Sequence, residues 1–142
     1  MIRSLDQMAG LVAASGKRHR IAVAWAQDTN TLSAIDRAVK DGLIEAILIG
    51  KKTEIHNSCE LLSITTDFEV IESADESGAA AEAVRMVRHG EADIVMKGLV
   101  TSDKFLKAVL NKETGLMIPD AVLSYVCAIQ VPAYHKLLFV TD

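Results

Sequence analysis

Four residues in one short stretch could bind an anion. Lys97 and Gly98 follow a short apolar run, residues 92–96. Thr101 and Ser102 come next, where a helical pattern begins. A lysine supplies a positive charge, a glycine lets the backbone approach a ligand, and the start of a helix presents N–H groups beside the hydroxyls. This spacing predicts a site for phosphate or an acyl phosphate.

The same turn also fits a plain surface loop. On spacing alone, Lys97 would be solvated and Thr101 or Ser102 would only cap the helix, and the two interpretations carry equal weight. The glycine-rich GxxxxGK[ST] pattern of phosphate-binding loops is missing from the sequence. The turn by itself does not separate an anion site from a structural loop.

Composition indicates one folded domain with a hydrophobic core, because the 142 residues are 50% hydrophobic and 24% charged. Lys and Arg number 15 against 19 Asp and Glu, and no basic cluster is interleaved with aromatic residues, so we expect no nucleic-acid partner. No apolar run reaches the roughly 18 residues of a membrane span. Asp6 also puts a charge into the segment that would be apolar in a signal peptide. We expect a cytoplasmic protein without a membrane partner.

The cysteines and histidines show no metal-ligand spacing. Cys59 and Cys127 form no CxxC pair, and the histidines are widely scattered. We therefore expect no metal site. His135 lies beside Tyr134 at the entry to the last apolar run, and we keep it as a possible cleft residue, although a loop role is favoured.

Strand and helix patterns alternate along most of the chain. Four short apolar runs are typical of buried strands: residues 20–26, 45–50, 68–72 and 92–96. With amphipathic stretches between them, they predict an α/β fold with a mostly parallel sheet wrapped by helices. Ligands bind such sheets outside the carboxyl ends of the strands. Gln27 and Asp28 fall on that edge together with Lys97, and both are possible cleft residues.

Capping patterns predict where helices begin. Ser4 and Gln7 have the spacing of a capping box, and so do Ser73 and Glu76. Asp28 is favoured as a helix N-cap over an acid facing a cleft. These assignments place each helix start directly after a strand or at the beginning of the chain.

The pattern changes after residue 110. Asn111 and Lys112 most simply end a helix, and a position in the ligand cleft is the less favoured alternative. Residues 122–131 and 136–140 have strand patterns, and their short connection leaves either an antiparallel pair or two separate sheets. The second of these runs is apolar and ends close to Asp142, so we expect either a truncated chain or a partner that covers it.

Three stretches closely resemble the phosphate acetyl/butyryltransferase family, and in particular its phosphate butyryltransferase branch. They are RIAVAWAQDTNTLSAI, ADIVMKGLVTSDKFLKAVLNKETGL and VPAYHKLLFVTD. The resemblance implies that residues 1–142 are the N-terminal α/β domain of a phosphate acyltransferase, similar in fold to the first domain of isocitrate and isopropylmalate dehydrogenases. It also implies homodimers, and a second domain that is not part of this sequence.

By the same resemblance, the reaction moves an acyl group between coenzyme A and phosphate: butyryl-CoA and phosphate give butyryl phosphate and CoA. Coenzyme A is then a substrate, acyl-CoA and phosphate are the partners, and no cofactor is required. The family's catalytic residues lie in its later half, so they are unknown here. Phosphate or acyl phosphate would be bound by Lys97, Gly98, Thr101 and Ser102, with Asn111 and Lys112 as weaker candidates.

Three hypotheses stay open. The first is a phosphate acyltransferase represented by its N-terminal half and inactive alone. The second is a non-catalytic module of the same ancestry that binds phosphate or CoA, or only dimerises. The third is a related-fold enzyme such as a decarboxylating dehydrogenase, which would need metal-binding carboxylates that the sequence does not reveal.

Overall fold

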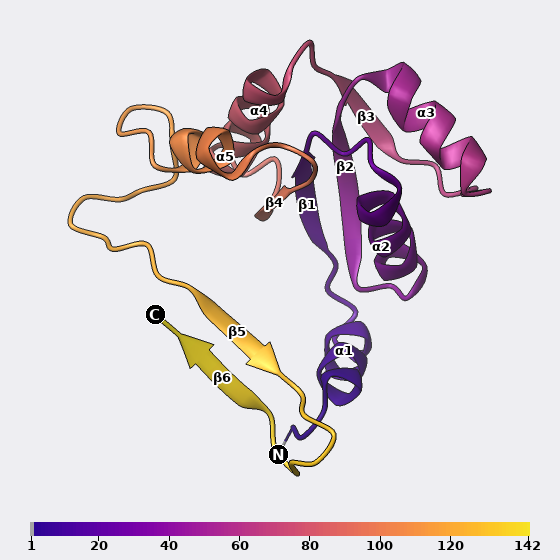
Figure 1. Ribbon diagram of the computed structural model, residues 1–142, viewed down its shortest axis with the longest axis vertical. Coiled ribbons are helices and arrows are strands. Elements are labelled where there is room, and N and C mark those ends of the chain that lie inside the picture. Colours follow the sequence, from indigo (N-terminus) through magenta and orange to yellow (C-terminus); the bar gives the residue numbers. More distant parts are fainter. Residues whose placement is uncertain (1) are drawn as a thin grey trace. The chain divides into compact units, whose positions relative to one another are not determined.

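Two compact units make up the chain in a computed structural model, which describes residues 2–142. The sheet unit is Arg18–Met117, and the hairpin unit combines the residues up to Lys17 with Ile118–Asp142. Figure 1 shows the elements of both units along the chain. The sheet unit carries the α/β architecture, and it contains all of the predicted anion-binding residues.

An open parallel sheet forms the centre of the sheet unit (Figure 1). Its strand order is β3-β2-β1-β4, and all three pairs are parallel. The strands are β1 (His19–Ala24), β2 (Ile44–Gly50), β3 (Glu69–Glu72) and β4 (Ile94–Lys97). The predicted α/β fold with a mostly parallel sheet is therefore confirmed.

A helix follows each strand of this sheet. These are α2 (Thr29–Lys40), α3 (Lys52–Leu61), α4 (Glu76–Arg88) and α5 (Ser102–Val109). One hydrophobic cluster joins Ala22 and Ala24 of β1 to α4 and α5, and a second joins Val23 to α2 and α3. Successive strand residues point to opposite faces, so helices cover both faces of the sheet. This two-sided burial explains why the strands read as continuous apolar runs.

Two helix starts differ in how well the sequence predicted them. Asp28 is the N-cap of α2, as predicted, and its Oδ1 accepts the Thr31 N–H at 2.9 Å. The capping box at Ser73 and Glu76 is wrong, because Asp75 is the N-cap of α4 and accepts the Gly78 N–H at 2.8 Å. Glu76 is thus the first residue of α4, and its side chain is left for other contacts.

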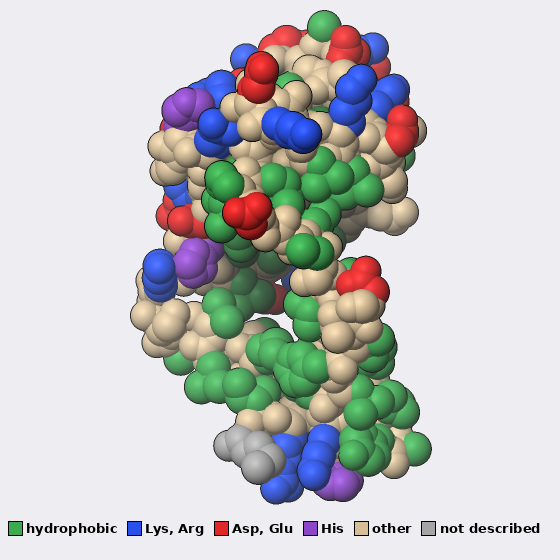
Figure 2. All heavy atoms as spheres, turned by 90° about the vertical axis from the view of Figure 1, so that its left-hand side faces the viewer, with side chains coloured by type: hydrophobic (Ala, Val, Ile, Leu, Met, Phe, Trp, Pro, Cys, Tyr) green, Lys and Arg blue, Asp and Glu red, His purple; other side chains and the backbone are tan. Residues whose placement is uncertain are grey.

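The hairpin unit consists of α1 (Leu5–Ala14), β5 (Val126–Ile129) and β6 (Leu138–Thr141). Ser4 caps α1 by accepting the Gln7 N–H at 3.1 Å, as predicted. The two strands pair antiparallel, which decides between the alternatives left open by the sequence. Figure 2 shows hydrophobic side chains gathered over this unit, and several are well exposed: Leu11, Val122, Tyr125, Val126 and Phe139.

Candidate anion-binding site

Lys97 lies at the carboxyl edge of the sheet, where the sequence placed it. It is the last residue of β4 and stands opposite Ala24, the last residue of β1. Its side chain is exposed, and its Nζ lies 3.4 Å from the carbonyl oxygen of Gly98. The ammonium group is therefore open to solvent at the edge where parallel sheets bind their ligands.

Gly98 is required by the neighbouring strand. A Cβ atom there would lie 2.7 Å from the carbonyl oxygens of both Ala24 and Trp25. Its φ is not among the positive values, so the constraint is space and not an unusual dihedral angle. β1 passes too close for any side chain at this position, and the expectation that this glycine lets the backbone approach an anion stays a prediction.

Three of the amides in this turn are already bonded. The N–H groups of Gly98 and Leu99 donate to the carbonyl oxygens of Ala24 and Trp25, at 2.9 and 3.0 Å. The Thr101 N–H donates to Glu76 Oε2 at 3.2 Å, so it is not free as expected. The turn offers an incoming anion the Lys97 ammonium and the exposed hydroxyls of its helix start.

Trp25 shapes this edge in a way that the sequence did not predict. It was expected inside the first strand, but it follows β1 with a φ of 59°. The left-handed conformation is costly for a bulky residue. Two backbone contacts hold it: its carbonyl oxygen accepts the Leu99 N–H, and Ala26 N–H donates to Ile49 O at 3.1 Å. This bend carries the chain from β1 to Gln27 and Asp28.

Gln27 and Asp28 lie on the predicted edge and are engaged in holding loops together. Gln27 Oε1 accepts the Lys51 N–H at 3.0 Å, and its carbonyl oxygen accepts the Ser58 hydroxyl at 2.9 Å. Asp28 Oδ2 is buried, and no atom in the part of the chain that the structure describes donates to it. Burial alone would raise the pKa of Asp28, but the hydrogen bonds from Thr31 outweigh it and lower the pKa.

Carboxylates of the protein itself stand at the amino ends of all four helices that follow the strands. A helix amino end favours negative charge, so each carboxylate is well placed. They are Asp28 at α2, Glu72 at α3, Asp75 at α4 and Glu76 at α5, and Glu72 Oε2 accepts the Lys52 N–H at 2.9 Å. An anionic ligand at this edge therefore meets helix starts that already hold acids.

Two carboxylates, those of Glu76 and Asp103, lie at the start of α5. The Thr101 N–H first, and then Lys104, hold the pKa of Glu76 below its usual range. The Thr101 side chain likewise lowers the pKa of Asp103. Both carboxylates are therefore ionised at neutral pH, and the ammonium group of Lys104 lies 3.2 Å from Glu76 Oε2.

Asn111 and Lys112 lie beyond the opposite end of α5 from Ser102. Asn111 follows the far end of α5, about 12 Å along an eight-residue helix. Its Oδ1 accepts the N–H groups of Glu113 and Thr114, both at 2.9 Å, so it closes a turn, and Lys112 lies within that turn. His135 belongs to the hairpin unit, where its ring centroid lies 5.1 Å from that of Tyr134.

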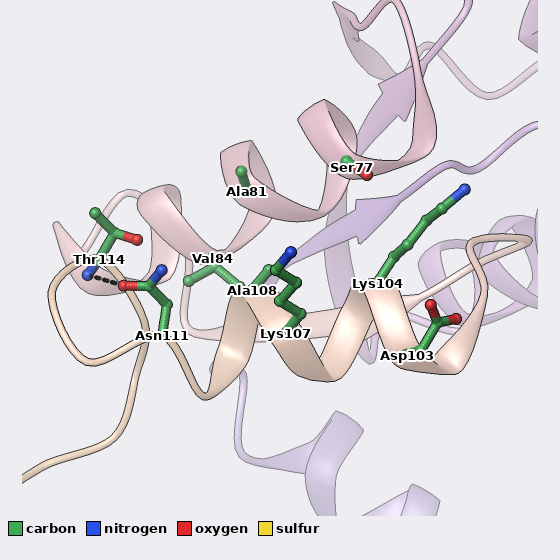
Figure 3. A pocket seen from close by; sticks show the side chains of 9 residues that line it. All are labelled: Ser77, Ala81, Val84, Asp103, Lys104, Lys107, Ala108, Asn111 and Thr114. Carbon is green, nitrogen blue, oxygen red and sulfur yellow. Dashed lines mark hydrogen bonds between the residues drawn. The ribbon is translucent and has the colours of Figure 1, made fainter.

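A groove between α4 and α5 was not predicted from the sequence. It has a volume of about 440 Å³, with Val84 and Ala108 on its apolar part (Figure 3). Lys104 extends from α5 toward the first turn of α4, and Asn111 and Thr114 lie at the opposite end (Figure 3). Its residues come from two helices and from the turn after α5, which is why no sequence motif marks it.

Within residues 2–142, no group of three or more His, Cys, Asp or Glu side chains could hold a metal ion. None of the described helices is both long and apolar enough to cross a membrane.

Solved structures place this fold among the phosphotransacylases. A phosphotransacetylase from Streptococcus pyogenes superposes with a TM-score of 0.70 at 18% identity, covering 87% of this chain and 46% of the other. A branched-chain phosphotransacylase from Enterococcus faecalis V583 gives 0.67 at 22% identity, covering 87% and 42%. At these identities the likeness concerns the fold alone.

Sequence comparison finds relatives named phosphate butyryltransferase. No family model matches the chain. A phosphate butyryltransferase of Clostridium beijerinckii is 40% identical over 124 residues, covering 87% of this chain and 41% of the relative. One from Clostridium acetobutylicum is 38% identical over 143 residues, covering 100% and 47%. The chain spans about half the length of these relatives. By sequence it is a homologue of the N-terminal half of phosphate butyryltransferases, which confirms the predicted resemblance.

Proposed function

We propose that this chain is the N-terminal half of a phosphate butyryltransferase, which transfers a butyryl group between coenzyme A and phosphate. The observation that carries the proposal is the 38% identity to the Clostridium acetobutylicum relative along the full chain. The phosphotransacylase-like fold supports it, since the candidate site lies on the edge where such sheets bind ligands.

Lys97 is the residue that we assign to the phosphoryl group of phosphate or butyryl phosphate. Its ammonium is exposed at the carboxyl edge, and the hydroxyls of Thr101 and Ser102 lie a few residues further along the same turn. Gly98 acts indirectly, because it lets β4 pack against β1 and so fixes the position of Lys97. A positive charge held in place stabilises the charge that builds up on phosphate oxygens during the transfer.

In the transfer, the thiolate sulfur of CoA attacks the carbonyl carbon of butyryl phosphate. The carbon–oxygen bond to phosphate breaks, and phosphate leaves with the electron pair. The cation at Lys97 would stabilise that leaving group, while the base that removes the thiol proton would come from the rest of the protein. In this scheme CoA is a substrate, and no cofactor takes part.

A cytoplasmic location and a homo-oligomer complete the proposal. The substrates are metabolites of the cell interior, and no described helix could span a membrane. The exposed side chains of Val126 and Phe139 in the hairpin unit favour burial against a second chain or against the other half of the protein.

A chimera tests the proposed function. This chain would replace the matching half of the Clostridium acetobutylicum phosphate butyryltransferase, and CoA release from butyryl-CoA in phosphate would be followed with a thiol reagent. We expect activity in the chimera, strong loss on Lys97→Gln, and little change on Lys107→Gln. The isolated chain should show no turnover. A folded but inactive chimera would instead favour a non-catalytic module of the same ancestry.

A further inference from the structure

Glu76 connects the first turns of two helices. It is the first residue of α4, yet its Oε2 lies 3.2 Å from the Thr101 nitrogen and 3.2 Å from Lys104 Nζ, both at the start of α5. The side chain is 27% exposed and that of Lys104 is 42% exposed, so solvent reaches the pair. One carboxylate therefore takes up an amide and an ammonium that could otherwise contact a phosphate.

This carboxylate occupies the position of an anion at the amino end of α5. Thr101 is the N-cap of α5 and makes no side-chain capping hydrogen bond, and its own N–H donates to Glu76, which comes from another helix. The arrangement resembles the way helix starts bind phosphate or sulfate, with a protein carboxylate as the anion. Among the four acids at this edge, Asp28 and Asp75 cap their own helices, whereas Glu76 reaches across to the turn that carries Lys97.

We infer that Glu76 limits anion binding at the turn between β4 and α5. Its carboxylate competes with phosphate for the Thr101 N–H and the Lys104 ammonium, so that a bound phosphate contacts Lys97 without the help of these two groups. This inference rests on the proposed anion site. Glu76 is then a positioning residue that sets the affinity for phosphate and keeps product release fast. It does not itself touch the reacting atoms.

Sulfate titration by amide NMR tests this with single variants of the full chain. Sulfate keeps its double charge at the pH values used, so only protein groups titrate. Glu76→Gln removes the charge and keeps the shape of the side chain. Glu82→Gln makes the same change in net charge two turns along α4, where Glu82 pairs with Arg85. Both are compared with the wild-type chain and with Lys97→Gln.

We expect Glu76→Gln to bind sulfate about tenfold more tightly than the wild type, as a freed charged hydrogen-bonding partner would allow. Glu82→Gln should stay within about twofold. The Thr101 amide resonance should move with sulfate in Glu76→Gln and stay in place in the wild type. If Glu76 only holds α4 against α5, Glu76→Gln should instead bind sulfate as tightly as the wild type or more weakly.

The outcomes separate the inference from the proposed site. Sulfate binding that needs Lys97 but is no tighter in Glu76→Gln than in Glu82→Gln overturns the inference and leaves the site standing. No sulfate shift at Lys97 or Ser102 in any variant overturns both. If Glu76→Gln does not fold, Glu76→Ala is the second variant. Alanine has a high helix propensity, and the substitution also removes the carboxylate.

The pH dependence gives an independent readout. Hydrogen bonds from Thr101 and Lys104 lower the pKa of Glu76, so its carboxylate loses its charge only at acidic pH. Sulfate affinity of the wild type should rise as the pH falls through that pKa, and Glu76→Gln should lack this step. An identical pH profile in both proteins would contradict the inference.

Discussion

Gly98→Ala should destabilise the sheet unit without removing any polar group. The added Cβ would lie 2.7 Å from two backbone carbonyl oxygens, those of Ala24 and Trp25. Both belong to the chain at the end of the central strand β1, so neither can move aside as a flexible side chain would. The strands must separate locally instead.

The expected cost follows from two contributions. Forcing an extra methyl group into a packed position costs about 1–3 kcal/mol. Separation of the strands also weakens the hydrogen bonds from Gly98 and Leu99 to β1, each with a net value of about 0.5–1.5 kcal/mol. Together they give about 3 kcal/mol, a large fraction of the roughly 5–15 kcal/mol that holds a domain folded.

Urea unfolding followed by far-UV circular dichroism is the assay. With a slope of about 2 kcal/mol per molar urea, the midpoint should fall by about 1.5 M. Leu99→Ala is the matched control, because the next side chain in the same turn is 56% exposed, and its effect should stay within about 0.5 kcal/mol. A Gly98→Ala midpoint equal to that of the control would refute the steric argument.

Two further predictions concern titrating groups. Asp28→Ala should cost about 1 kcal/mol near neutral pH. Hydrogen bonds, first of all from Thr31, outweigh burial and lower the Asp28 pKa, so the stability gap between wild type and variant should narrow as the pH falls through that pKa. A gap that does not change with pH would count against this prediction. Burial, and then the charge of Asp36, raise the pKa of the Cys59 thiol. In the Cys127→Ser variant, Cys59 should therefore react slowly with a thiol reagent until urea is added. Fast reaction of Cys59 in the folded protein would disprove this prediction.

The parallel sheet was predictable because its evidence is local. β1 and β2 are covered on both faces, so their sequences are apolar throughout, and the helices between them carry their own periodicity. The N-cap at Asp28 was predictable for the same reason, since its partner Thr31 lies three residues away. The position of Lys97 at the carboxyl edge, where ligands bind such sheets, was predictable because it follows directly after an apolar run.

The contacts that define the candidate site were not predictable, because they join distant segments. Glu76 was assigned to the start of its own helix, and nothing in its neighbourhood indicates Thr101, 25 residues later. The reason for Gly98 depends on how closely β1 passes, and the bend at Trp25 depends on bonds to Leu99. A pattern of residue types does not show which backbone amides already donate hydrogen bonds within the fold.

Phosphate binding by the isolated chain tests the central claim most directly. Titration with phosphate, followed by amide and lysine-side-chain NMR, should give saturable shifts at Lys97 and Ser102. Lys97→Gln should weaken binding about tenfold or more, as loss of a charged hydrogen bond predicts, and Lys107→Gln on the groove side of α5 should leave it unchanged. Shifts that are absent, or that persist unaltered in Lys97→Gln, would contradict the assignment of this edge as the phosphate site.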